Sequence, residues 1–196
     1  MPVRWENYDY GQRGLYFITI CTKHRMPVLS QIDEAEMDSA DTGKFNWKTN
    51  IMKFPLCTDD VNVQPSEIGI KVLECWNNIE KLNRNVTIDH YVMMPDHIHG
   101  IISIGSQPLL NEVNGRYPYQ VAESTEHRVL SGLIKDFKSV TTRYFKRITG
   151  MQMSLWQDSF DIKVIFNHEY YIRLYHYMLN NPRKWMLEKQ ARDVDR

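Results

Sequence analysis

The pattern of hydrophobic and polar positions along the chain predicts an alternation of strands and helices. Residues 14–21 are rich in aromatic and β-branched side chains, which favours a buried strand. Apolar residues recur at helical spacing over 66–83, which predicts an amphipathic helix. Two apolar runs, 86–94 and 98–104, are separated by a proline–aspartate pair. Because that pair forms turns, these runs predict a β-hairpin.

The second half of the chain continues this alternation. Apolar positions after Ser124 predict a long helix that ends at Gly150, and its outer face is basic. The alternation within 155–166 predicts a strand that follows a loop. Asn167 can cap a last helix. We expect residues 180–182 to end or kink this helix, because the residue before a proline avoids helical geometry.

This order of elements is typical of the split β-α-β arrangement. We therefore predict an α+β, ferredoxin-like fold, with an antiparallel sheet, helices packed on one face and a C-terminal helix that carries the candidate tyrosine described below. The acidic and polar stretch 30–65 is interpreted as an insertion or long loop, and 105–123 as a loop. A length of 196 residues with 42% hydrophobic residues fits a single domain over 1–196.

Composition narrows the functional classes. The 24 lysines and arginines equal the 24 acidic residues, so any nucleic-acid-binding face must be local. Three widely spaced cysteines without a C-x-x-C motif argue against a disulfide framework and against a cysteine zinc site. No apolar run approaches the roughly 20 residues that a bilayer requires. We therefore expect a cytoplasmic protein without membrane insertion.

The sharpest chemical feature is the pair His97 and His99. Residues i and i+2 of a strand point to the same face, so both imidazoles project together. Imidazole suits manganese, zinc, iron or nickel, and magnesium can be held where a substrate phosphate supplies further oxygens. The alternative is a pair of purely structural histidines. Asp96 could orient either ring, or could serve only to form the turn.

A third ligand lies in the last predicted helix. Asn181 follows Tyr177 by four residues, so both side chains lie on one helical face. The other tyrosines of the two C-terminal helices have an apolar or aromatic residue four positions later; they are Tyr144, Tyr170, Tyr171 and Tyr175. The alternative for Tyr177 is an amphipathic core tyrosine with its hydroxyl at the surface.

Candidate nucleic-acid contacts fall into two groups. The predicted long helix carries a basic stripe, and two further cations follow the candidate tyrosine; these residues are Lys135, Lys138, Arg143, Lys146, Arg147, Arg183 and Lys184. A solvated helix face is the alternative for the stripe. Three aromatic residues could stack on unpaired bases or pack in the core or a loop: Tyr117, Tyr119 and Trp156.

Several motifs together resemble one family. They are Tyr-Phe-Ile-Thr-Ile-Cys-Thr at 16–22, Asp-His-Tyr-Val-Met-Met-Pro-Asp-His-Ile-His-Gly-Ile-Ile at 89–102, Phe-Lys-Ser at 137–139, Leu-Trp-Gln at 155–157 and Tyr-x-Leu-Asn-Asn-Pro-x-Lys-Trp at 177–185. In this order they resemble the REP-associated tyrosine transposases, which belong to the single-tyrosine, His-hydrophobic-His (HUH) transposases. The resemblance spans about 14–185, apart from roughly 30–65 and 105–123.

The resemblance implies a function and a set of site residues. His97, His99 and Asn181 would bind a divalent metal, Mg²⁺ or Mn²⁺, and Tyr177 would be the nucleophile. The implied reaction is cleavage and rejoining of single-stranded or hairpin DNA through a covalent 5′-phosphotyrosine intermediate. Members act as monomers or as homodimers that exchange the tyrosine helix, so both states remain open, as does whether Tyr177 serves its own histidines.

Two other functions remain open at this stage. One is a catalytically inactive, domesticated binding protein for structured nucleic acid, and the other is a zinc hydrolase that uses water. The chain also departs from the family after Trp156: a familiar histidine is replaced by Ile162 or Lys163, and a familiar arginine by a residue near Phe166. We expect the substrate contacts of this segment to differ from those of the family.

Overall fold

The fold is described by a computed structural model over residues 13–35, 60–105 and 129–194. Its elements, in chain order, are β1 (Gly14–Cys21), the 3-10 turn η1 (Lys23–Arg25), β2 (Ser30–Glu34), β3 (Val61–Pro65), α2 (Glu67–Leu82), β4 (Val86–Met94), β5 (His97–Ile104), α3 (Val129–Thr149), β6 (Asp161–Ile165) and α4 (His168–Val194). Four strands form an antiparallel sheet in the order β4-β5-β1-β6, and β2 pairs with β3 in a separate sheet. The predicted ferredoxin-like α+β fold is confirmed.

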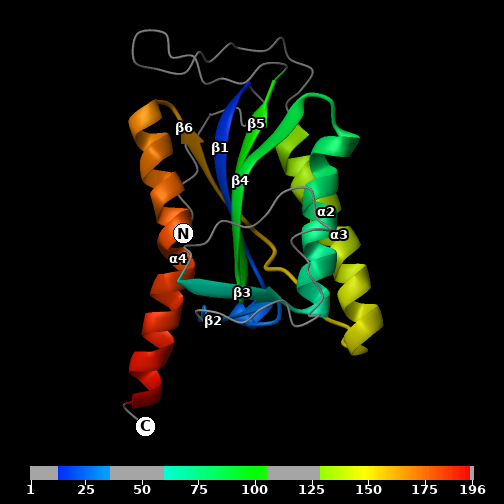
Figure 1. Cartoon of the computed structure of the whole chain (residues 1–196). Helices are drawn as coiled ribbons and strands as arrows, with labels where there is room; N and C mark the ends of the chain where they lie inside the picture. Colours follow the sequence, from blue (N-terminus) through cyan, green and yellow to red (C-terminus); the bar gives the residue numbers. More distant parts are fainter. Residues whose placement is uncertain (1–12, 36–59, 106–128, 195–196) are drawn as a thin grey trace, which may run out of the picture.

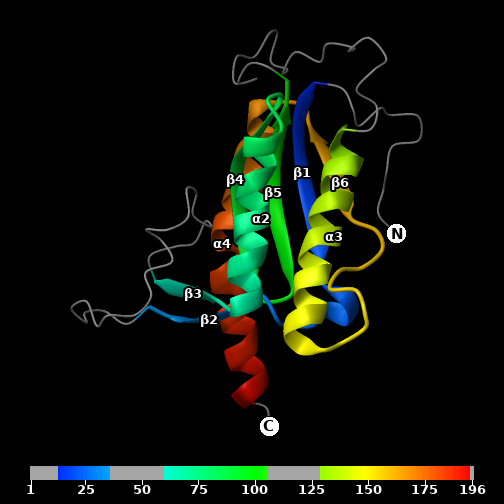
Figure 2. The same cartoon turned by 90° about the vertical axis from the view of Figure 1, so that its right-hand side faces the viewer.

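The helices lie on both faces of the four-stranded sheet. Figure 1 shows α2 and α3 on one face and α4 on the other, and Figure 2 shows the same layers from the side. The alternation along β1 accounts for this arrangement, because Ile18 and Ile20 pack with α2 and α3 while Leu15 and Phe17 pack with α4. The C-terminal helix therefore covers the face opposite the two crossover helices.

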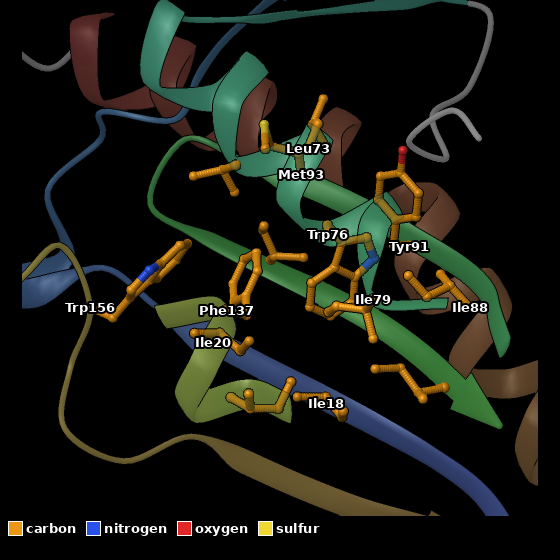
Figure 3. Close-up of a cluster of buried hydrophobic side chains, with 14 of the residues drawn as sticks. Ile18, Ile20, Leu73, Trp76, Ile79, Ile88, Tyr91, Met93, Phe137 and Trp156 are labelled. Carbon is orange, nitrogen blue, oxygen red and sulfur yellow. The ribbon is translucent and has the colours of Figure 1, made fainter. Parts of the chain in front are cut away.

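Trp76 of α2 is at the centre of the larger core (Figure 3). Its ring lies edge-on to the ring of Phe137, with centroids 5.3 Å apart. The indole also lies against the backbone of Gly100 in β5, where an added Cβ atom would stand 2.4 Å from Trp76 Cζ2. The glycine that follows His99 thus makes room for the tryptophan that holds α2 on the sheet.

Gly100→Ala is expected to lower the free energy of unfolding by about 1–3 kcal/mol, the usual cost of overpacking a dense core. The control is Gly132→Ala in α3, where an added Cβ meets nothing within 4 Å. Because alanine is the better helix former, that variant should gain about 0.5–1 kcal/mol. Urea unfolding measures both, and equal stability of the two variants would contradict this account of Gly100.

We expected residues 180–182 to end or kink the last helix. The helix continues through Pro182, so an end at these residues is wrong. A proline inside a helix costs about 3 kcal/mol. The half of α4 after the proline offsets this cost by burying Met186 and partly burying Trp185 in the core between α4 and the strands, which includes Ile32 of β2 and Val63 of β3. Arg183 adds an ion pair with Asp60 at 3.1 Å. As a result, Asn181 keeps its helical position one turn after Tyr177.

The other predicted elements agree with the structure except at the ends of two segments. The interval 30–65, which we expected to be an insertion or long loop, is bounded by paired strands, β2 and β3. The predicted strand within 155–166 is confined to β6. The predictions for 36–59, for 106–123 with Tyr117 and Tyr119, and for the helix start after Ser124 fall outside the described residues.

Two further observations concern membrane-spanning helices and cysteines. None of the described helices combines the length and the apolar character needed to cross a bilayer. Cys21 and Cys75 are free thiols, and burial raises the pKa of each.

Candidate active site

The two histidines and the tyrosine come together between β5 and α4. Nε2 of His97 lies 3.0 Å from Nε2 of His99, and the Tyr177 hydroxyl lies 3.3 Å from the latter atom. The imidazoles are only 6% and 4% exposed, whereas Tyr177 is 49% exposed. The strand therefore supplies two buried nitrogens, and the helix places a phenol over them that remains open to solvent.

The opposite nitrogen of each ring is held by a neighbouring side chain. Nδ1 of His97 lies 2.5 Å from Asp96 Oδ1, and Nδ1 of His99 lies 2.8 Å from Thr19 Oγ1. An ionised carboxylate can only accept, so Asp96 holds the Nδ1–H of His97, and a neutral His97 ring would then present its Nε2 lone pair. Thr19 Oγ1 can accept from His99 in the same way. Both Nε2 lone pairs then face the same point.

The electrostatics of His99 favour its neutral form. Burial lowers the pKa of His99 well below its ordinary value, and the positive charges of Arg25 and Lys163, as well as any charge on a protonated His97, act in the same direction. A neutral imidazole is the form that ligates metals. Two lone pairs 3.0 Å apart repel each other unless a proton or a cation lies between them, and metal–nitrogen bonds of about 2.1 Å allow such a spacing. The pair fits a cation site.

Asn181 supplies a further polar group to the same site. It lines the cavity that contains both histidines and Tyr177, and its Nδ2 atom is buried without a hydrogen-bond partner among the described residues. Among the described residues, there is no group of three or more His, Cys, Asp or Glu side chains that could hold a metal ion. A cation between the histidines would therefore take the carboxamide oxygen of Asn181, or substrate oxygens, as further ligands.

Arg25 fixes Asp96 behind the histidines. Arg25 Nε lies 2.7 Å from Asp96 Oδ2, and Asp96 is only 3% exposed. Arg25 and its neighbour His24 both have positive φ, 55° and 54°, a conformation that costs about 1–2 kcal/mol for a residue with a Cβ atom. The strained turn thus brings a guanidinium against the carboxylate that orients His97.

Asp96→Asn is expected to weaken binding of Mn²⁺ about 10–100-fold, the usual effect of losing the group that orients a ligating histidine. The amide keeps the shape of the side chain but loses the charge that pairs with Arg25. The matched control is Asp158→Asn, a surface carboxylate that lies 3.4 Å from Lys23. Calorimetric titration with Mn²⁺ measures both, and an affinity unchanged by Asp96→Asn would exclude an orienting role.

The site opens into a cavity of about 630 Å³ in which cationic side chains outnumber acidic ones. Four cationic side chains reach it from three elements, η1, β6 and α4: Arg25, Lys163, Arg173 and Lys184. Two acidic residues, Asp161 and Glu188, also line it. The excess of positive charge suits a phosphodiester backbone.

The structure separates the sequence-predicted cations into two locations. Lys184 lines the active-site cavity, and Arg183 beside it pairs with Asp60. The stripe on α3 lies on the other face of the sheet; it comprises Lys135, Lys138, Arg143, Lys146 and Arg147. The structure therefore does not bring the α3 stripe to the tyrosine.

Lys138 of this stripe and the nearby Trp156 are both held by hydrogen bonds within the protein. Lys138 Nζ donates to the carbonyls of Gln157 and Asp158 at 2.6 and 3.0 Å, and burial lowers its pKa. Trp156 is fully buried, and its Nε1 donates to Thr141 Oγ1 at 2.7 Å. Trp156 is thus a core residue and does not form a surface for stacking on bases.

Three cations of the cavity were not among the sequence-predicted site residues: Arg25, Lys163 and Arg173. Arg173 and Lys163 could have been predicted from helix and strand periods. Arg173 precedes Tyr177 by one helical turn, so it lies on the same stripe as Asn181. Lys163 pairs with Phe17 on the site face of the sheet, while Ile162 points into the opposite core. The replacement for the family histidine that reaches the site is therefore Lys163. Arg25 depends on the strained turn, which has no sequence signal here.

The fold and the site together define a class of protein: an α+β domain in which a tyrosine lies over a buried pair of histidines. No protein-family model matches the chain. The chain is 25% identical over 190 residues to an uncharacterized protein of Haemophilus influenzae, a match that covers 93% of this chain and 88% of that protein.

Two solved structures are similar to the chain. One is a REP-associated tyrosine transposase bound to a REP hairpin, at 16% identity and a TM-score of 0.49, with 93% of this chain and 73% of that chain covered. The other is a candidate transposase of Deinococcus radiodurans R1, at 12% identity and a TM-score of 0.41, with 89% and 94% covered.

Proposed function

We propose that this protein is a metal-dependent DNA transposase that cleaves and rejoins single-stranded or hairpin DNA through a covalent phosphotyrosine. The observation that carries the proposal is the position of the Tyr177 hydroxyl, which lies 3.3 Å from Nε2 of His99, while Nε2 of His97 lies 3.0 Å from the same His99 atom. The order of the sequence motifs supports the same reaction. The cationic cavity supports a nucleic-acid substrate.

The proposed step is an attack of a phenol on a phosphodiester. Tyr177 Oη forms a bond to phosphorus while the bond from phosphorus to the 3′ oxygen breaks, which leaves a 5′-phosphotyrosine and a 3′-hydroxyl. The phenol proton leaves to water through the open side of the cavity, and water returns a proton to the 3′ oxygen. The new link is itself a phosphodiester, so a 3′-hydroxyl can reverse the step and rejoin DNA without ATP.

His97, His99 and Asn181 are the residues that would hold the divalent metal, Mg²⁺ or Mn²⁺. When bound, the metal supplies positive charge that makes the phosphate more electrophilic and favours phenolate over phenol. Asp96 and Thr19 hold the histidines in the orientation that this requires. The neighbouring cations, Arg173 and Lys184 among them, would bind the DNA backbone.

The test uses a pool of hairpin oligonucleotides with randomised loops and single-stranded flanks, since a REP hairpin is the DNA in the similar transposase structure. The pool is labelled at either end and incubated with the protein and Mn²⁺. We expect a denaturant-resistant adduct that retains the 3′ label, together with a released 5′-labelled fragment ending in a 3′-hydroxyl. Sequencing of the joined fragments gives the cleaved position.

The same assay separates the other functions. Cleavage of the pool without any adduct would indicate a hydrolase that uses water, and retention of the pool without cleavage would indicate a binding protein that no longer cuts. Either result would contradict the proposed function. An adduct that forms equally well in EDTA would contradict the metal dependence alone.

A further inference from the structure

A second cavity of about 540 Å³ adjoins the active site. The C-terminal half of α4 forms one wall through Trp185, Lys189 and Arg192, while β2 and the β4–β5 turn form the other through Ser30, Ile32 and Pro95. Figures 1 and 2 both show β2 and β3 beside this half of α4. Trp185 lines both cavities, and its ring centroid lies 6.5 Å from that of His97. A group bound here would therefore lie next to the histidine pair, where the proposed function puts the scissile phosphate.

The walls of this cavity combine flat apolar surfaces with one unused polar atom. Trp185, Ile32 and Pro95 supply the apolar surface. Ser30 is 3% exposed, and its hydroxyl has no hydrogen-bond partner among the described residues. A buried hydroxyl without a partner is unfavourable, so it is expected to find one in a bound molecule. A nucleobase has flat apolar faces and a polar edge, and it matches both features.

The rim of the cavity carries positive charge. Lys189 and Arg192 are exposed, and Lys189 Nζ is 3.8 Å from Asp33 Oδ1 in a surface pair that costs little to break. Arg192 uses Nε to donate to the carbonyl of its own helix at Glu188, at 3.0 Å. Two cations beside an aromatic platform are the combination by which proteins bind single strands, phosphates on the charges and bases on the ring.

We propose that this cavity binds one unpaired nucleobase of the DNA strand beside the scissile phosphate. Trp185 stacks on the base, the Ser30 hydroxyl contacts its edge, and Lys189 and Arg192 bind the adjoining phosphates. The inference rests on the proposed function, because the base belongs to the strand that Tyr177 attacks. It adds a source of sequence preference that the histidines and the tyrosine do not provide.

The test measures binding with Tyr177→Phe protein, so that covalent chemistry does not interfere. Molecules retained from the hairpin pool are sequenced to find the preferred base at each unpaired position. We expect one flank position to show a preference that Ser30→Ala flattens while the other positions stay unchanged. An abasic residue at that position should weaken binding about 10-fold in the parent and 2-fold or less once Trp185→Ala is added, since stacking on one base is worth about that much.

Two variants complete the test. Arg192→Ala should weaken binding to all sequences alike and reduce its salt dependence. Lys81→Ala, an exposed lysine at the end of α2, is the control and should change nothing. If neither Ser30→Ala nor Trp185→Ala alters the preference or the abasic penalty at any position, the base-binding role is wrong, while adduct formation by the wild-type protein would leave the proposed function standing. If the pool is not bound at all, both fall.

Discussion

Tyr177→Phe is expected to lower the yield of covalent protein–DNA adduct by at least about 10³-fold, because it removes the attacking oxygen. Binding of the hairpin should change little, since the phenyl ring keeps its contacts with Phe17 and His99. The fold should also be retained, because Tyr177 is half-exposed and lies outside the two cores. Denaturing gels measure the adduct, and fluorescence polarisation measures binding.

The matched control for this change is Tyr175→Phe on the same helix. Tyr175 contacts His90 edge-on, with ring centroids 5.0 Å apart, and does not line the active-site cavity. Its hydroxyl should be dispensable for the adduct. If the adduct persists in Tyr177→Phe but is lost in Tyr175→Phe, the nucleophile is Tyr175 and our assignment is wrong. The orientation of α4 would then have to differ from the one described.

Replacing the two histidines is expected to have the second large effect. The double variant His97→Ala, His99→Ala removes both nitrogens of the proposed cation site, so calorimetry should no longer detect Mn²⁺ binding, and the adduct should disappear as it does in EDTA. Both rings are buried, so circular dichroism should first confirm that the variant is folded.

Two further variants make this test specific. His176→Ala alters an exposed histidine of α4 and should leave Mn²⁺ binding unchanged. Asn181→Asp keeps an oxygen ligand and adds charge, so it should retain Mn²⁺ binding, whereas Asn181→Leu should weaken it. Unchanged Mn²⁺ binding after loss of both histidines would place the metal elsewhere and contradict the proposed site.

Much of the fold could be predicted because single patterns dominate its elements. The spacing of Val72, Trp76 and Ile79 defines the buried face of α2, and Ser66 caps it by accepting from the N–H of Gly69 at 3.0 Å. The β4–β5 hairpin follows equally directly from two apolar runs around a Pro-Asp turn. In these elements local preference and tertiary packing agree.

The parts that sequence reasoning missed depend on contacts between distant segments. The residue before a proline usually avoids helical geometry, but Trp185 and Met186 keep the helix intact by packing on strands that no pattern in 30–65 had predicted. The face taken by α4 was equally unspecified, because its apolar side could have covered either side of the sheet. In the structure α4 packs with Leu15, Phe17 and the other buried residues of the face opposite α2.

The candidate site likewise has residues that local patterns predict and residues that depend on contacts between distant segments. His97, His99, Tyr177 and Asn181 could be selected because strand and helix periods place each pair on one face. The surroundings could not, since Arg25 reaches Asp96 through two residues with positive φ, and Thr19 reaches His99 across a strand pairing. The predicted ligands thus came from local geometry, and their orienting partners from the assembled sheet.

Peptide mapping of the adduct tests the central claim most directly. The adduct is trimmed with nuclease, digested with protease and analysed by mass spectrometry for the residue that carries the remaining nucleotide. We predict a nucleotide joined through its 5′-phosphate to Tyr177, formed only in the presence of Mg²⁺ or Mn²⁺. A nucleotide found on any other residue, or joined through a 3′-phosphate, would contradict the account.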